Sequence, residues 1–442
     1  MGNIYVYIGI LLFVLTVLSF IGYFLYQRYY NKHINNRLNH KSNKKIKLYP
    51  DHYLKFICLP VFILFILFWA IVGIYTIYET EYSQTSKYEL EYELKEDNTY
   101  KVIGIGNLNS KDLVIPSSYK GRKVTSIGEF AFSNVKISSV YIPDSVTELE
   151  YSVFMGCSEL TNVRLSNNIK KINFGVFNAC SSLEQINIPS SVVSIGEFAF
   201  ADCSSLSIVN MGDDVTVIED SAFSGCKNLV SFDFPLKLNR LGNYAFSYSG
   251  LINLVLPDTL TKLGTGVFQY CTELNDVKLG DGIKGIPEET FINCTKLKSV
   301  EFGKNITYVG NKAFYLCSNL VDVLFNNSLK VIGEYAFYGC DDLEKIEFIN
   351  VEKISSYAFS RCYMLASVNL GGSIKYLYKY AFEGCEFVSI YIPKSVVYLD
   401  FDCFISTKLD FIYYEGTVEE WDLIEKENKR EINIIFNYID GV

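Results

Sequence analysis

The sequence is poor in the residues on which most enzyme chemistry depends. Its 442 residues contain three histidines, His33, His40 and His52, so the chain after His52 has no imidazole to activate a nucleophile or to bind a metal. It also lacks G-x-S-x-G, H-E-x-x-H and P-loop motifs. Carboxylate-pair hydrolysis stays open as an alternative, but most acidic residues occupy solvent positions of the repeat described below. We therefore expect no enzyme, no cofactor, no metal site and no small-molecule substrate.

Positive charge is scarce in most of the chain. Residues 79–442 hold 32 Lys and Arg against 48 Asp and Glu, a net charge of −16, whereas residues 1–78 hold eight basic residues and one acid. An acidic surface repels phosphate backbones, which excludes nucleic acid as a partner of the larger part. A hydrophobic content of 49% excludes a disordered chain.

Two long uncharged runs, 4–26 and 56–78, lie near the N-terminus. As helices each would reach about 35 Å, enough to cross a bilayer. A cleaved signal peptide is the alternative for the first run, although no basic residue precedes it. The eight basic residues all lie between the runs, in 27–55, where they set topology or contact anionic lipids. The sequence thus predicts a plasma-membrane protein with two spans, a cytoplasmic loop, and both termini and the large domain outside.

A regular repeat governs the rest of the chain, in which a Phe recurs at every twenty-second or twenty-third position. A small or β-branched residue directly precedes each Phe, and Ile, Leu or Val stands five and eight positions earlier. A Leu-x-x-Val-x-Leu run follows, with the alternation of a half-buried strand. We predict an α/β solenoid about 60 Å long, with a parallel sheet on one face and a turn or short helix around each Phe. The thirteen copies are Phe132, Phe154, Phe177, Phe200, Phe223, Phe246, Phe268, Phe291, Phe314, Phe337, Phe359, Phe382 and Phe404.

Ten of the twelve cysteines follow the same period, three residues after a repeat Phe. There is no C-x-x-C motif and no histidine nearby, so a disulfide framework or a metal site fits poorly. We expect a ladder of buried thiols that act as small hydrophobic groups and weak donors. Its members are Cys157, Cys180, Cys203, Cys226, Cys271, Cys294, Cys317, Cys340, Cys362 and Cys385.

The repeat at 188–206, IPSSVVSIGEFAFADCSSL, resembles the BspA-like (Treponema-type) leucine-rich-repeat family. So do LVIPSSYKGRKVTSIGEFAF before the repeats and YYEGTVEEWDLI after them. The resemblance implies a linker and cap at 79–112, a solenoid of thirteen repeats at 113–414 and a cap at 415–442. Within the second cap, Thr417 and Glu420 form a capping-box pattern, and Val418, Trp421 and Ile424 share a helix face. The family also implies a surface protein that adheres to host proteins or other cells.

Solenoids of this type bind through exposed strand positions. One such row, called the strand row below, mixes charged, amide and aromatic residues, which indicates freedom from core packing. We expect it to bind a protein, with a hot spot at Tyr391, Phe411 and Tyr413. The alternative is a scaffold or sensor that binds a membrane protein of the same cell. The strand row is Tyr141, Arg164, Asn187, Asn210, Asp233, Val255, Lys278, Glu301, Leu324, Glu347, Asn369, Tyr391 and Tyr413, with Phe411 beside it.

Overall fold

The computed structural model describes Arg28, residues 90–107 and residues 110–437. The chain divides into two compact units, Met1–Thr85 and Ser86–Val442. The runs 4–26 and 56–78 lie outside the described residues, as does the loop between them apart from Arg28. The fold described here is that of the second unit.

The predicted two-span membrane topology is wrong. In the part of the chain that the structure describes, no helix has the length and apolar character needed to cross a bilayer. The α-helix after the repeats, α4 (Val418–Leu423), has six residues and spans about 9 Å, against the roughly 30 Å of a hydrocarbon core. The predicted integral plasma-membrane location is corrected accordingly.

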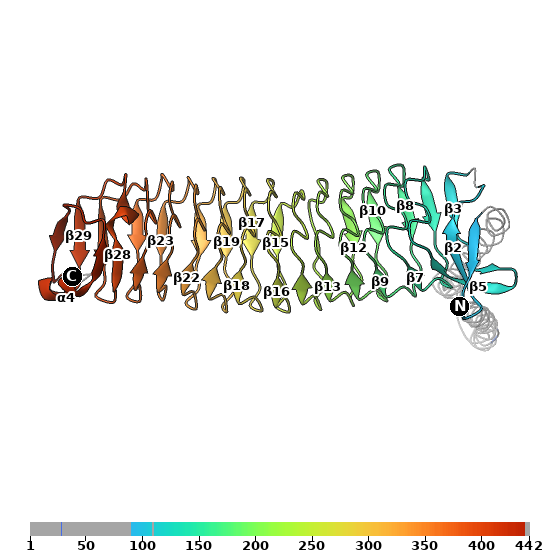
Figure 1. The fold of residues 1–442 in the computed structure, drawn as a ribbon, viewed down its shortest axis with the longest axis horizontal. Coiled ribbons are helices and arrows are strands. Elements are labelled where there is room, and N and C mark those ends of the chain that lie inside the picture. The colour runs from blue at the N-terminus through green and yellow to red at the C-terminus, as the bar shows by residue number, and fades with distance from the viewer. Residues whose placement is uncertain (1–27, 29–89, 108–109, 438–442) are drawn as a thin grey trace, which may run out of the picture. The chain divides into compact units, whose positions relative to one another are not determined.

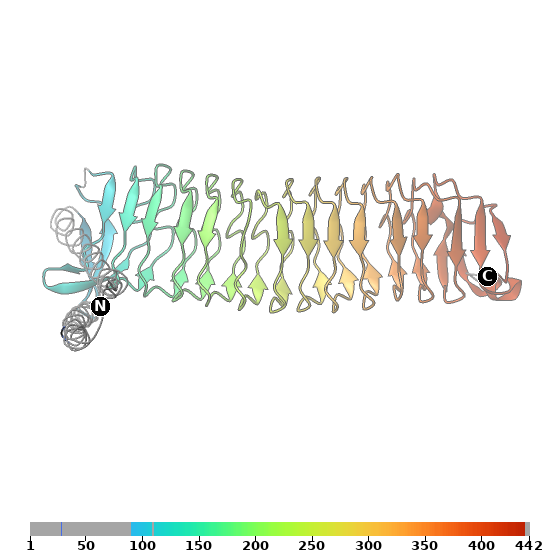
Figure 2. The same ribbon diagram turned by 180° about the vertical axis from the view of Figure 1, so that it is seen from behind.

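Most turns of the solenoid, here called coils and named by their repeat Phe, contain one longer strand and one shorter strand, and the Phe223 coil lacks the longer one. Coil after coil, these strands stack into two rows that run along the solenoid (Figures 1 and 2). Strands within a row pair in parallel, one coil apart: Ser194 lies opposite Lys171 on one side and Val217 on the other. With the additional strands at both ends, the solenoid has about fifteen turns.

The bounds of the elements follow the repeat. The long-strand row consists of β3 (Asp112–Val114), β6 (Ser139–Tyr141), β8 (Asn162–Arg164), β10 (Gln185–Asn187), β12 (Ile208–Asn210), β15 (Asn253–Val255), β17 (Asp276–Lys278), β19 (Ser299–Glu301), β21 (Asp322–Leu324), β23 (Lys345–Glu347), β25 (Ser367–Asn369), β27 (Ser389–Ile392), β29 (Phe411–Tyr414) and β31 (Asn433–Ile435). The short-strand row consists of β7 (Glu148–Leu149), β9 (Lys171–Ile172), β11 (Ser194–Ile195), β13 (Val217–Ile218), β14 (Arg240–Leu241), β16 (Lys262–Leu263), β18 (Gly285–Ile286), β20 (Tyr308–Val309), β22 (Val331–Ile332), β24 (Lys353–Ile354), β26 (Tyr376–Leu377), β28 (Tyr398–Asp400) and β30 (Glu425–Glu427). The N-terminal end also contains β1 (Glu91–Leu94), β2 (Tyr100–Gly104), β4 (Ser118–Tyr119) and β5 (Arg122–Ile127), and β5 pairs with β7.

The fold is a parallel β-solenoid rather than the predicted α/β class, because the segment around each repeat Phe, expected as a turn or a short helix, forms a turn in nearly every coil and follows a second row of short strands. Within residues 90–437 the helical elements that the structure describes are α4 and the 3-10 helix η2 (Phe401–Phe404). Close approach of the coils explains why glycine can follow a short strand: a Cβ on Gly196 would lie 2.7 Å from the carbonyl oxygen of Ile172. The backbone of adjacent coils leaves no room there for a side chain.

The segment around each repeat Phe, called the turn edge below, runs from the third position before it to the second position after it. In the Phe200 coil, the N–H groups of Phe198, Phe200 and Asp202 donate to carbonyl oxygens of the next coil at 3.0, 2.8 and 2.7 Å. Phe198 and Asp202 are left-handed, with φ of 54° and 58°. Left-handed residues two positions before and two positions after the repeat Phe interrupt the helical geometry, so these N–H groups point toward the next coil instead of closing a helix.

The core centres on the thirteen repeat Phe rings, all of which are buried. Every ring stacks on the ring of the next coil, with centroids 4.9 to 6.3 Å apart and planes within 22° of parallel. Stacked aromatic pairs contribute about 0.5–1.5 kcal/mol beyond the burial of their area. The predicted phenylalanine column is therefore confirmed as a continuous stack of rings.

The predicted thiol ladder is also confirmed. All ten periodic cysteines are buried and free, and each Sγ donates to the carbonyl oxygen of the repeat Phe in the preceding coil at 3.0 to 3.3 Å. Burial raises the pKa of Cys157 and of Cys271 to about 11, and raises the pKa of the other members as well. The thiols therefore link coils and stay protonated at neutral pH.

Replacing a ring in the middle of the stack tests its contribution. We expect Phe223→Ala to lower the free energy of unfolding by about 3–5 kcal/mol, because it removes a buried ring and leaves a cavity between two coils. Phe174→Ala, at a ring that is 42% exposed, serves as the control and should cost less than about 1 kcal/mol. Denaturant titration measures both, and equal losses would contradict the role of the stack.

Raising the pH tests the thiol ladder. Unfolded thiols ionise near pH 8.5, whereas the folded thiols stay protonated because their pKa is raised, so stability must fall as the pH rises above about 8.5. Cys271→Ala should reduce this fall by about 1 kcal/mol per pH unit between pH 9 and 10. Unfolding free energies of wild type and variant at pH 7, 9 and 10 provide the measurement. Identical slopes for the two proteins would show that the thiol is not protected.

Candidate protein-binding surface

In the three-residue strands of the long-strand row, the strand-row residue is the last residue of the strand. In the four-residue strands β27 and β29 it is the third residue. Register makes it continuous over several coils: Val255 lies opposite Lys278, Lys278 opposite Glu301, and Glu301 opposite Leu324. The residues from Asn187 to Asn369 in this row are exposed, whereas those nearer its two ends are half-buried. The half-buried members are Tyr141, Arg164, Tyr391 and Tyr413.

Several members of the strand row contact one another across coils. Asn210 Nδ2 donates to Asn187 Oδ1 at 2.6 Å, and Lys278 Nζ lies 2.9 Å from Glu301 Oε1. Near the N-terminal end, the guanidinium carbon of Arg164 lies 4.4 Å from the ring centroid of Tyr141. These polar side chains thus order each other before any partner arrives, which lowers the entropy that binding must overcome.

The strand row departs from the sequence expectation at Asp233 and at its C-terminal end. Asp233 is exposed but belongs to no strand, because Phe232 and Phe234 take the places of smaller core residues and pack against Phe246, with centroids 4.8 and 5.4 Å away. At the other end the row runs one coil further, since Ile435 of β31 lies opposite Tyr413. The sequence pattern missed β31 because no repeat Phe stands one period after Phe404 to mark the turn that carries it.

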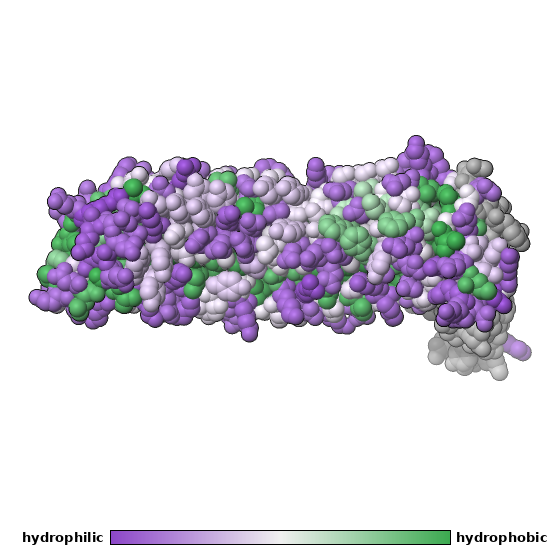
Figure 3. Space-filling view, in the orientation of Figure 1, coloured by the Kyte–Doolittle hydropathy of each residue, from purple (hydrophilic) through white to green (hydrophobic). Residues whose placement is uncertain are grey.

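The predicted hot spot is assembled but is not evenly exposed. Tyr391 lies opposite Tyr413, and Ser389 lies opposite Phe411, so all three aromatic residues come together on β27 and β29. Phe411 is exposed, whereas Tyr391 and Tyr413 are half-buried. Hydrophobic residues on the face seen in Figure 3 are scattered among hydrophilic ones rather than gathered in one band.

The turn edge carries a second group of aromatic residues that the sequence analysis did not single out. They stand beside the repeat Phe residues and share their period, which is the signal that identifies them: Tyr335, Tyr357 and Tyr380 are one example. Stacked pairs connect neighbouring coils, such as Tyr248 with Tyr270 and Tyr335 with Tyr357, both with centroids 4.6 Å apart. The group is Phe130, Tyr151, Phe174, Phe198, Tyr244, Tyr248, Tyr270, Tyr315, Tyr335, Tyr338, Tyr357 and Tyr380.

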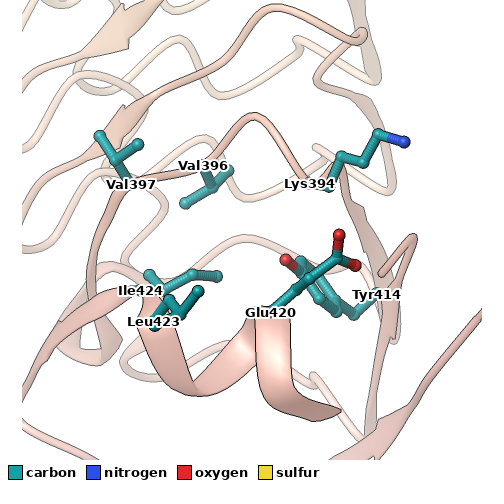
Figure 4. A pocket seen from close by; sticks show the side chains of 7 residues that line it. All are labelled: Lys394, Val396, Val397, Tyr414, Glu420, Leu423 and Ile424. Atoms are coloured by element: carbon teal, nitrogen blue, oxygen red, sulfur yellow. The ribbon is translucent and has the colours of Figure 1, made fainter. Parts of the chain in front are cut away.

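The C-terminal end contains a small pocket between α4 and the last coil (Figure 4). The predicted capping box is present: Thr417 N–H donates to Glu420 Oε2 at 2.9 Å, and Glu420 N–H donates to Thr417 Oγ1 at 3.3 Å. Trp421 and Ile424 are buried as expected, but Val418 is exposed. With a volume of about 240 Å³, the pocket is smaller than typical ligand sites. Its lining residues are Lys394, Val396, Val397, Tyr414, Glu420, Leu423 and Ile424.

Similarity to known proteins agrees with this architecture. The sequence matches the profile of the BspA type leucine rich repeat region over residues 107–230, 193–321, 239–365 and 284–410. No curated protein matches it. The structure is similar to that of a leucine-rich repeat protein from Bacteroides ovatus, with 28% identity, 78% of this chain and 98% of that chain covered, and a TM-score of 0.51.

Two further solved structures show lower similarity. One is a leucine rich cell surface protein from Faecalibacterium prausnitzii, with 23% identity, 78% of this chain and 97% of that chain covered, and a TM-score of 0.41. The other is the pneumococcal vaccine antigen PcpA, with 18% identity, coverage of 80% and 98%, and a TM-score of 0.47.

Proposed function

The chain belongs to the BspA-type leucine-rich-repeat family, and on that premise we propose that its solenoid binds a protein partner along the strand row and serves in adhesion to proteins of a host or another cell. The repeat supplies a stiff support, because each coil is held by its neighbours through stacked rings and backbone hydrogen bonds. A stiff surface loses little entropy on binding.

One observation carries this proposal: the middle of the strand row has large apolar side chains where packing requires none. Val255 and Leu324 are 65% and 64% exposed, although their strand neighbours Leu254 and Val323 already fill the inward positions. Between them lies the Lys278–Glu301 ion pair, so two aliphatic side chains flank a polar centre. Exposed apolar side chains of this kind favour a protein contact that removes them from water.

The polar centre supports selectivity rather than raw affinity. An exposed ion pair contributes about 0–1 kcal/mol to stability, so Lys278 and Glu301 are not needed to hold the solenoid together. A partner that covers them must offer matching charges, since burying either group without a counterpart costs several kcal/mol. The row can therefore discriminate between partners of similar shape.

The adhesive role rests on the likeness of the repeats, such as residues 188–206, to those of BspA-type proteins. A row of about thirteen coils at roughly 4.8 Å per coil extends over about 60 Å, long enough for a standard interface of about 800 Å² per partner. The exposed Phe411 and Ile435 at one end offer further apolar contact.

A double substitution in the strand row tests this function. We expect Val255→Ser with Leu324→Ser to weaken binding of the labelled full-length chain to foreign cells at least tenfold, because the apolar contact is lost. The free energy of unfolding should change by less than about 1 kcal/mol, since both side chains are mostly exposed. Quantitative cell-binding assays and denaturant titration give the two readouts.

The matched control is Val193→Ser with Tyr308→Ser, two exposed apolar residues outside the row. Equal losses in both double variants would contradict the strand row as the binding surface. Binding confined to envelopes of the producing cell would contradict adhesion and support the scaffold alternative.

A further inference from the structure

The pocket between α4 and the last coil has a wall of aliphatic side chains. Val396 and Ile424 are buried, whereas Val397 and Leu423 are exposed at the rim. The volume of about 240 Å³ is too small for a drug-sized ligand but leaves room for a molecule of the size of valine or leucine. An aliphatic group in this pocket would remove the exposed rim residues from water.

A buried hydroxyl group faces the pocket without a partner. Tyr414 is 1% exposed, yet its Oη makes no hydrogen bond with the residues that the structure describes. In Figure 4 this oxygen points into the space that α4 and Val396 border. Burial raises the pKa of Tyr414, so the hydroxyl keeps its proton and can donate as well as accept. A buried hydroxyl left unpaired costs free energy, which a ligand that bonds to it recovers.

Glu420 places a carboxylate in the same pocket in a fixed position. Its Oε2 accepts from the Thr417 N–H at 2.9 Å, and this capping-box bond holds the side chain against the start of α4. The second oxygen, Oε1, makes no hydrogen bond or ion pair in the described part of the chain. One carboxylate oxygen is therefore available to accept from a cationic group in the pocket.

Lys394 supplies the opposite charge. Its backbone N–H donates to Glu415 Oε2 at 3.0 Å, which fixes the loop after β27, whereas its ammonium forms no ion pair within residues 90–107 and 110–437. Lys394 approaches the pocket from the coil and Glu420 from α4 (Figure 4). The lining residues thus hold one positive and one negative group, and their net charge is zero.

These groups together select a class of ligand. A molecule that answers both charges needs an ammonium for Glu420 and Tyr414 and a carboxylate for Lys394, with an aliphatic part for the apolar wall. A free aliphatic α-amino acid combines all three in a molecule of the right size. The N-terminus of a peptide lacks the carboxylate and its C-terminus lacks the ammonium, so each would leave one charge of the pocket without a counterpart.

We propose that this pocket binds a free aliphatic α-amino acid, such as leucine or valine. The aliphatic side chain lies against Val396 and Ile424. The ammonium donates to Glu420 and Tyr414, and the carboxylate accepts from Lys394. The amino acid is held as a ligand, and no bond in it changes. The proposal goes beyond protein binding by the strand row and does not depend on it.

Isothermal titration calorimetry of the full-length chain tests the ligand class with L-leucine, glycine, leucinamide and N-acetyl-leucine. Glycine lacks the side chain, leucinamide the carboxylate and N-acetyl-leucine the ammonium. We expect L-leucine to bind at least tenfold more tightly than each of the others, because each of them loses one kind of contact. Absence of L-leucine binding would overturn the proposal. Equal or tighter binding of leucinamide or N-acetyl-leucine would overturn it as well and assign the pocket to a peptide end.

Variants of the lining residues test the contacts. Tyr414→Phe removes only the unpartnered hydroxyl, so it should weaken L-leucine binding at least threefold without lowering the midpoint of denaturant unfolding. Glu420→Gln preserves the capping box, and Lys394→Gln changes an exposed side chain, so both variants should fold and bind L-leucine at least tenfold more weakly. Wild-type affinity in Tyr414→Phe and Glu420→Gln would contradict the assigned contacts.

The matched controls are Tyr376→Phe on β26 and Lys429→Gln after β30, which change residues that do not line the pocket. Both should bind L-leucine as the wild type does, and a loss equal to that of the pocket variants would contradict the site. The strand-row variant Val255→Ser with Leu324→Ser should also bind it normally. Failure of the strand-row proposal and failure of this one are therefore distinguishable.

Discussion

Contact between identical rings of successive coils is the interaction on which this structure depends. A single coil cannot bury its own apolar side, but a Phe in every coil meets the Phe of each adjoining coil at 4.9 to 6.3 Å. The stack aligns the coils, and the backbone then bonds from coil to coil on three sides: along the two rows of strands and along the turn edge. Stability in such an array is close to a sum over neighbouring coils.

The same constraint explains which positions vary. Inward positions repeat one residue type because each must fit between two copies of itself, as the Phe and Cys columns do. The Cys Sγ also satisfies a second lone pair of the Phe carbonyl oxygen in the preceding coil. Outward positions meet no such demand, so the strand row and the turn edge are free to carry charge and aromatic side chains. The strand row proposed for binding is thus a product of the packing that holds the coils.

Periodicity made the core predictable and left the ends and the fine geometry hidden. The Phe stack, the buried thiols and the alignment of the strand row follow from a repeat that places equivalent residues one coil apart. The short-strand row was missed because strands as short as Ser194–Ile195 cannot show alternation. Strands β30 and β31 escaped notice because their turn has no repeat Phe to mark it, and contacts such as Asn210 with Asn187 depend on rotamers. The predicted membrane topology rested on the runs 4–26 and 56–78, which lie outside the described residues, and on the basic segment between them.

The central claim is that coils are interchangeable units held in register by their rings. Removing 269–291, which is one complete coil, tests it most directly, because the ring of Phe268 can then stack on that of Phe314. Thermal unfolding followed by circular dichroism should show a cooperative transition close to that of the intact chain. A chain lacking only 269–280 breaks the register and should lose the transition. If removal of the complete coil abolished folding as fully as removal of the partial coil, the account would be contradicted.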